Sequence, residues 1–162
     1  MMRKGMRNGF ACLFLAGLMS ACVSSSILWT GNHSFSGTTW VLEEPVVFTP
    51  DTMSLKDSTA TASTGILSIR YTSGAGIERL PLVMEIESPA DGVYKCDTIY
   101  PRFLPVSERT PHKGKVGIFE TIDTIPLHSN VTPGWTVSFY PALEDDVKGI
   151  ISLTLDVIKN EK

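Results

Sequence analysis

Hydrophobic and polar residues alternate with a period of two along four stretches of the chain. In "ILSIRYTS", Leu67, Ile69 and Tyr71 share one face, and Ser68 and Arg70 lie on the other. A period of two with one apolar face indicates β-strands that bury one side and leave the other in solvent. The same alternation recurs in three more groups of apolar residues: Leu82, Met84 and Ile86; Trp135, Val137 and Phe139; and Ile151, Leu153, Leu155 and Val157.

Three further apolar runs, residues 40–48, 93–100 and 116–122, bring the predicted number of strands to about seven. Turn-forming clusters such as residues 89–92 separate the runs, and no stretch keeps a helical period for three turns. About seven short strands at this spacing predict an all-β fold, an antiparallel β-sandwich of immunoglobulin-like or jelly-roll-like type. Because proline cannot donate a ladder hydrogen bond, Pro45 predicts an edge strand or a bulge in the first run.

The chain begins with the layout of a secretory signal peptide. Arg3, Lys4 and Arg7 form a basic region, residues 10–17 are apolar, and small residues then lead to Cys22. A helix that crosses a membrane needs about 20 apolar residues, so this segment is too short for a permanent span. We therefore expect it to act in targeting.

The run Leu18-Met19-Ser20-Ala21-Cys22 resembles the bacterial lipobox, in which the cysteine thiol receives a diacylglycerol before the signal peptide is removed. We expect residues 1–21 to be a lipoprotein signal peptide, residues 22–35 to be the lipidated N-terminus and a tether, and residues 36–162 to form the β-sandwich domain. Two or more acyl chains, such as palmitate, anchor a protein stably, whereas one chain holds it only marginally. The alternative is a chance cysteine after an ordinary signal peptide.

Removal of residues 1–21 takes away three basic and no acidic side chains, which changes the net charge from −3 to −6. An acidic mature chain argues against nucleic acid as a partner and against a polybasic membrane-binding face. Of the three cysteines, Cys12 leaves with the signal peptide and Cys22 is lipidated, so Cys96 has no partner for a disulfide. Because Cys96 alternates in register with Tyr94 and Tyr100, we expect it to be a buried structural thiol, with a reactive nucleophile as the alternative.

The sequence contains few candidates for catalytic or metal-binding residues. His33, His112 and His128 are isolated from one another and from cysteine, so they form no zinc-type ligand set. The chain has no G-x-S-x-G, H-E-x-x-H or P-loop motif, and we predict no catalytic residue, metal site or cofactor. The acidic run "LEDDVKG" lacks the EF-hand spacing and is interpreted as a solvated hairpin turn. Glu85 and Glu87 share a strand face, where a solvated surface explains them as well as a glycosidase pair does.

One short pattern recurs four times. Asp followed by Ser or Thr and then by an apolar residue or Thr begins at Asp51, Asp57, Asp97 and Asp123, where average composition gives about one occurrence. This triplet resembles the acceptor site of periplasmic O-glycosylation in Bacteroidetes, and ordinary composition is the alternative. The candidate acceptors are Thr52, Ser58, Thr98 and Thr124; the first two lie in a predicted loop, and the other two in or beside predicted strands.

The stretches "WVLEEPVVFT", "LSIRYTSGAG", "LPLVMEIESPADGVYKCDTI", "KGKVGIF" and "VKGIISLTLDVIK" together resemble the GldH family of gliding-motility lipoproteins. The likeness covers residues 40–159. Two family features differ: Ile69-Arg70-Tyr71 leads into Ala75-Gly76-Ile77 without the family's Tyr-Pro-Tyr turn, and only Gly114-Lys115-Val116-Gly117 stands in place of its Gly-Trp-x-Gly turn.

The resemblance implies a lipid-anchored β-sandwich of the cell envelope that is accessory to gliding and envelope export, without catalytic activity, and that works by binding protein partners. In Bacteroidetes, the signals that direct a lipoprotein to the cell surface resemble a run of acidic residues just after the lipidated cysteine. Residues 23–26 contain no acidic residue. We therefore expect an outer-membrane lipoprotein that faces the periplasm. The main alternative is a glycan-binding sandwich in which Tyr94, Tyr100 or Tyr140 stack on sugar rings.

Overall fold

A computed structural model describes residues 27–50, 64–89, 92–109, 117–127, 131 and 134–159 of the chain. These residues contain ten strands and two short 3-10 helices. In chain order they are β1 (Ile27–Ser34), η1 (Ser36–Thr38), β2 (Thr39–Trp40), β3 (Val46–Phe48), β4 (Thr64–Thr72), β5 (Leu82–Ser88), β6 (Val93–Ile99), η2 (Val106–Glu108), β7 (Ile118–Pro126), β8 (Thr136–Pro141), β9 (Val147–Lys148) and β10 (Ile150–Ile158).

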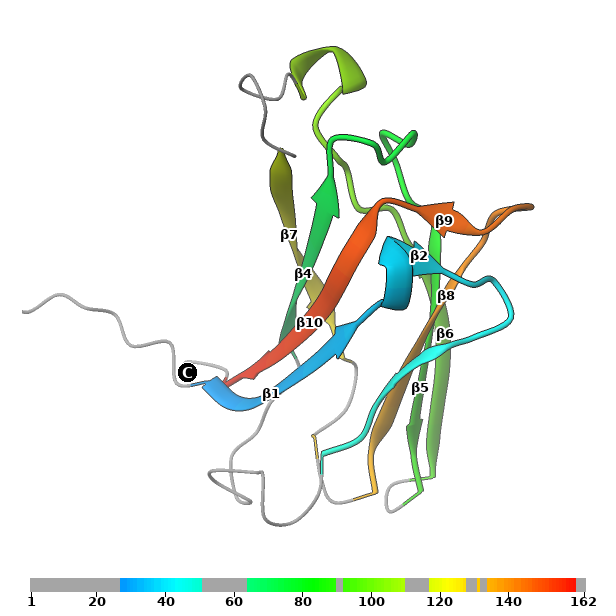
Figure 1. The fold of residues 1–162 in the computed structure, drawn as a ribbon. Coiled ribbons are helices and arrows are strands. Elements are labelled where there is room, and N and C mark those ends of the chain that lie inside the picture. The colour runs from blue at the N-terminus through cyan, green and yellow to red at the C-terminus, as the bar shows by residue number, and fades with distance from the viewer. Residues whose placement is uncertain are drawn as a thin grey trace, which may run out of the picture.

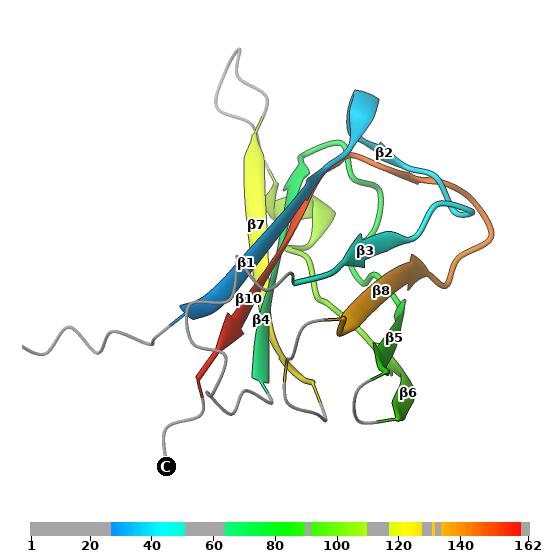
Figure 2. The same cartoon turned by 90° about the horizontal axis from the view of Figure 1, so that it is seen from below.

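Two four-stranded sheets face each other as the two layers of a β-sandwich (Figures 1 and 2). The first sheet has the strand order β1-β10-β4-β7, and the second has the order β3-β8-β5-β6. The short strands β2 and β9 pair with each other. Every strand pair is antiparallel, which confirms the predicted all-β, antiparallel sandwich.

The core between the sheets contains most of the residues that the alternation placed there. All of the predicted apolar positions on β4, β5 and β8 are buried, because a strand that packs on one side turns every second side chain inward. On β10 a bulge between Ile150 and Ser152 interrupts the alternation. Ile150 is consequently buried and Ile151 only partly so, which differs from the predicted face.

The first strand of the sandwich was not predicted. Residues 27–34, which we assigned to the tether, form β1 and pair with β10 along their whole length, so the predicted domain boundary at residue 36 is wrong. Gly31 resembles a turn residue in the sequence, but in β1 its lack of a side chain leaves room for two aromatic rings. A Cβ atom at Gly31 would lie 2.2 Å from the indole ring of Trp29 and 2.5 Å from the ring of Phe48. The glycine thus allows two aromatic rings to close the core over the strand.

Pro45 has the effect that was predicted for it. The run of residues 40–48 is divided into β2 and β3, and Pro45 lies immediately before β3. β3 is an edge strand of the second sheet, where a missing backbone N–H costs no ladder hydrogen bond.

The register of the strands defines two ends of the sandwich. Ile27 and Thr64 both pair with Ile158, so these residues lie together at the end where β1 begins, which we call the near end. β4 is nine residues long, about 30 Å, and leads away from it to Thr72. The opposite end, which we call the far end, holds the connections that follow β4 and β8, together with β2 and β9 (Figure 1).

Candidate functional site

The four candidate acceptor residues are only partly covered by the structure. Thr52 and Ser58, like the predicted lipidation site Cys22, lie outside the described residues. Thr98 lies in β6 and Thr124 in β7, as predicted. Both side chains are nevertheless exposed, because both strands are sheet edges and these positions face outward.

Cys96 is exposed, and the prediction that it is buried is wrong. β6 pairs with β5 so that the buried residues Met84 and Ile86 face Asp97 and Lys95, whereas Cys96 lies opposite Glu85. The thiol is therefore on the outer face of the second sheet. Polar residues occupy both faces of this edge strand, so its alternation gave no signal for which face is turned inward.

The outer face of the second sheet presents two tyrosines beside a carboxylate. Tyr94 on β6 is 60% exposed, and Tyr140 on β8 is partly buried. The hydroxyl of Tyr94 donates a hydrogen bond to Glu85, and this bond, together with the negative charge, raises the pKa of Tyr94 above its usual value. Tyr100, just beyond β6, is also exposed. The surface joins aromatic faces to hydrogen-bonding groups, and Glu85 is partly buried between them.

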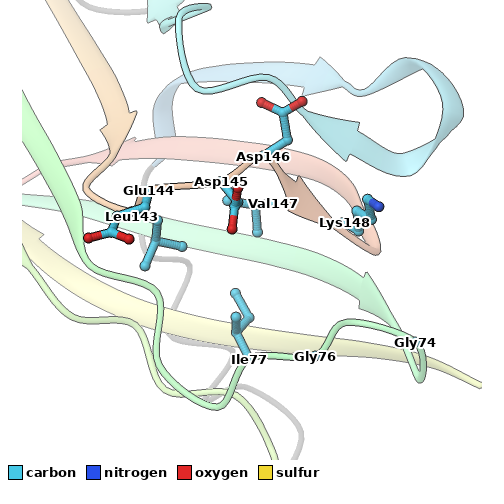
Figure 3. Close-up of a pocket in the computed structure, with 9 residues that line it drawn as sticks. All are labelled: Gly74, Gly76, Ile77, Leu143, Glu144, Asp145, Asp146, Val147 and Lys148. Carbon is cyan, nitrogen blue, oxygen red and sulfur yellow. The ribbon is translucent and has the colours of Figure 1, made fainter.

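The far end of the sandwich contains an open hollow of about 770 Å³. Two segments that are far apart in the sequence form it, one between β4 and β5 and one from the end of β8 through β9 (Figure 3). Its lining residues are Gly74, Gly76, Ile77, Leu143, Glu144, Asp145, Asp146, Val147 and Lys148. The hollow lies within the size range of ordinary ligand pockets.

Gly149 directly follows the second segment of the hollow and packs against the first. It has a φ of 85°, a conformation that glycine adopts without the steric cost that other residues meet. A Cβ atom there would lie 2.6 Å from the backbone nitrogen of Ala75. The carbonyl oxygen of Gly149 also accepts a hydrogen bond of 2.8 Å from the N–H of Thr72. Close backbone contact at this point sets the distance between the walls.

Arg109 holds the backbone of residues 75–77, which belong to the first segment of the hollow. The side chain is 2% exposed, and its guanidinium donates hydrogen bonds to the carbonyl oxygens of Ala75, Ile77 and Leu104. The guanidinium also lies over Tyr71, 5.1 Å from the ring centroid. The planar fork of arginine can satisfy several acceptors at once, so one side chain fixes the backbone on both sides of Gly76. No feature of the sequence distinguished this arginine from a surface residue.

The acidic run of the hollow is held at one point. The Oδ1 atom of Asp146 accepts a hydrogen bond of 3.0 Å from the N–H of Leu42. Figure 3 shows the carboxylate of Asp146 turned away from Ile77 and that of Asp145 turned toward it, whereas the side chain of Glu144 extends sideways along the rim. Within the described part of the chain, the side chains of Glu144 and Asp145 have no hydrogen-bond partner.

The prediction of a hairpin turn for this run is wrong in its topology. β8 pairs with β3 and β5, while β9 pairs with β2, so the segment crosses from one pairing to another and does not join two paired strands. Its solvent exposure was predicted: Glu144, Asp145 and Asp146 are exposed. The contact with residues 74–77 could not be inferred, because nothing in the local sequence encodes it.

The remaining candidates show no further clustering in the described residues. His33 is exposed and packs against Phe35, with 4.8 Å between the ring centroids, while His112 and His128 lie outside the described ranges. Within those ranges no three His, Cys, Asp or Glu side chains gather in a group that could hold a metal ion. The same residues contain no helix of sufficient length and apolar character to cross a membrane.

No protein-family model matches the chain, and no curated protein matches it. Among solved structures, Eiger TNF from S. frugiperda aligns with 84% of this chain and 96% of its own, at 6% sequence identity and a TM-score of 0.39. Dimeric latent PorU from Porphyromonas gingivalis aligns with 85% of this chain at 11% identity and a TM-score of 0.38, and the aligned part is 14% of the PorU chain. At such TM-scores, neither likeness carries an argument about function.

Proposed function

We propose that this chain is a non-catalytic, lipid-anchored protein of the bacterial cell envelope, which faces the periplasm and binds a protein partner at its far end. The observation that carries the proposal is the open hollow at the end of the sandwich opposite to the start of β1. The resemblance to gliding-motility lipoproteins suggests that the partner belongs to a motility or envelope-export complex.

The position of β1 supports this arrangement. Cys22 precedes Ile27 by five residues, and five residues of extended chain span at most about 18 Å. A lipid on Cys22 would therefore hold the near end of the sandwich close to the membrane. The far end would then stand away from the lipid surface, where a partner in the periplasm can reach the hollow.

Fractionation and crosslinking of intact cells test the proposal. We expect the protein in the membrane fraction, with a discrete adduct after brief formaldehyde treatment. Labelling of the cells with a radioactive fatty acid should tag the wild type and Cys96→Ala, which also removes one thiol, but not Cys22→Ala. A wild-type chain that takes up no label, or a Cys22→Ala variant that still takes it up, would contradict the anchored arrangement.

A second candidate function is glycan binding at the outer face of the second sheet. The observation that favours it is the pair Tyr94 and Tyr140 with Glu85 beside them, since sugar rings stack on aromatic faces and their hydroxyls bond to carboxylates. Co-sedimentation with insoluble peptidoglycan tests it. Tyr94→Ala should abolish binding, and Ile122→Ala, an equally exposed position on the first sheet, should leave it intact.

A further inference from the structure

We propose that the hollow at the far end binds the side chain of a lysine or arginine from the partner protein. This inference rests on the proposed function, because it takes the occupant to be a segment of a protein. It adds the chemistry by which the hollow recognises that segment.

The apolar part of the hollow fits the stem of a basic side chain. Val147 is buried, Ile77 is partly buried, and Leu143 is exposed, so aliphatic side chains line the hollow from its buried part to its rim. Lysine and arginine bury their methylene stems on apolar surface and keep the charged group in a polar environment. A volume of about 770 Å³ leaves space for such a side chain and for part of its backbone.

The charges of the hollow select a cation. The carboxylate of Asp145 is turned toward Ile77, that of Glu144 lies at the rim, and within the described residues neither has a hydrogen-bond partner. Lys148 supplies one positive charge at the same rim, against three acidic side chains, so an excess of negative charge remains. A neutral occupant would remove water from these carboxylates without replacing its hydrogen bonds, which is unfavourable, and an anion would be repelled.

The walls of the hollow are fixed before anything binds. Arg109 holds the carbonyl oxygens of Ala75 and Ile77, and Asp146 ties the acidic run to the N–H of Leu42. Gly149 sets the spacing between the two segments through its contact with Ala75. A preformed site loses less conformational entropy on binding, so even a single side chain can bind measurably.

Titration with small probes tests the inference directly. The full chain, in detergent micelles and with ¹³C-labelled Ile, Leu and Val methyl groups, is titrated with N-acetyl-arginine amide and followed by NMR. We expect saturable shifts at the methyl groups of Ile77, Leu143 and Val147. N-acetyl-citrulline amide, which has nearly the same shape but no charge, should cause no saturable shift.

Two double variants distinguish the effect of the carboxylates in the hollow from the effect of a lower net negative charge on the protein. Glu144→Gln combined with Asp145→Asn should weaken binding of the arginine probe by about fivefold or more, the effect of two partly exposed ion pairs. Glu87→Gln together with Asp156→Asn removes the same two charges elsewhere and should leave the affinity unchanged. Unshifted methyl resonances of Ile69 and Leu153 show that each variant keeps the core.

Equal binding of the citrulline probe, unchanged affinity in the Glu144/Asp145 variant, or shifts outside the hollow would each overturn the inference. The titration needs neither a membrane nor a partner. A negative titration with an intact crosslinked adduct in cells would therefore refute the basic side chain and leave the proposed function standing. A positive titration without any adduct in cells would refute the proposed protein partner and leave only the affinity of the hollow for a cationic side chain.

Discussion

Replacement of Arg109 by Met tests how the far end is held together. Arg109 donates to three backbone carbonyl oxygens, one of them that of Leu104 at 2.6 Å, and its guanidinium lies 5.1 Å and 5.9 Å from the ring centroids of Tyr71 and Phe103. Met keeps much of the apolar volume but donates no hydrogen bond. The substitution therefore removes the donor from one buried carbonyl oxygen, that of Ala75, and from two part-buried ones.

The magnitude follows from these contacts. A hydrogen bond with a charged partner contributes roughly 1.5–3 kcal/mol, and the cost of burying the guanidinium offsets part of the sum over three such bonds. We expect Arg109→Met to lower the free energy of unfolding by about 3–4 kcal/mol, a large share of the roughly 5–15 kcal/mol that a domain possesses. Arg109→Lys keeps the charge but cannot reach all three acceptors, and it should cost at least about 2 kcal/mol.

Urea denaturation followed by tryptophan fluorescence measures the change in unfolding free energy. Arg70→Met is the matched control, because Arg70 is exposed on the first sheet opposite Glu120, and its loss should change the free energy by less than about 0.5 kcal/mol. Wild-type stability in Arg109→Lys, or a loss below about 1 kcal/mol in Arg109→Met, would refute the view that the carbonyl contacts of Arg109 fix this end of the sandwich.

Three further predictions concern modification and the exposed thiol. Mass spectrometry of the mature N-terminal peptide should show an acylated Cys22, and an unmodified start at residue 23 or later would contradict the lipid anchor. A maleimide reagent should label Cys96 in the native protein nearly as fast as in urea, since the thiol is exposed on an edge strand, and strong protection of the native thiol would show otherwise. The intact mass of the native protein should exceed polypeptide plus lipid and should fall in a Thr52→Ala, Ser58→Ala variant; a mass equal to polypeptide plus lipid would exclude O-glycosylation.

The buried faces of the strands that pack on one side were predictable from the sequence, whereas the inward face of the edge strand β6 and the existence of β1 were not. Leu67, Ile69 and Tyr71 are buried because each sheet packs on the core with one face only. Their alternation with polar residues indicates this one-sided burial directly. On β6 both Lys95 and Cys96 are exposed, although they point to opposite faces, so the pattern could not indicate which face is turned inward. β1 was missed because Gly31 resembles a turn, whereas its role is to accommodate the rings of Trp29 and Phe48.

The candidate site depends on contacts between distant segments, which explains why it was not predicted. The acidic run was recognised, but its neighbours in space, residues 74–77, are about 70 positions earlier in the chain. The two meet because Gly149 packs on Ala75 and because Arg109 holds the carbonyl oxygens on both sides of Gly76. Each of these contacts is made by a single residue without a periodic pattern, so no local signal announces it.

The central claim is that the far end of an anchored sandwich meets the partner, and site-specific photocrosslinking in intact cells tests it most directly. A photoreactive residue at position 143, on the rim of the hollow, is compared with one at position 87, which is exposed toward the near end of β5. The account predicts a discrete adduct from position 143 that the Glu144→Gln, Asp145→Asn variant weakens, and no adduct from position 87. An adduct from position 87 alone, or equal adducts from both positions, would contradict it.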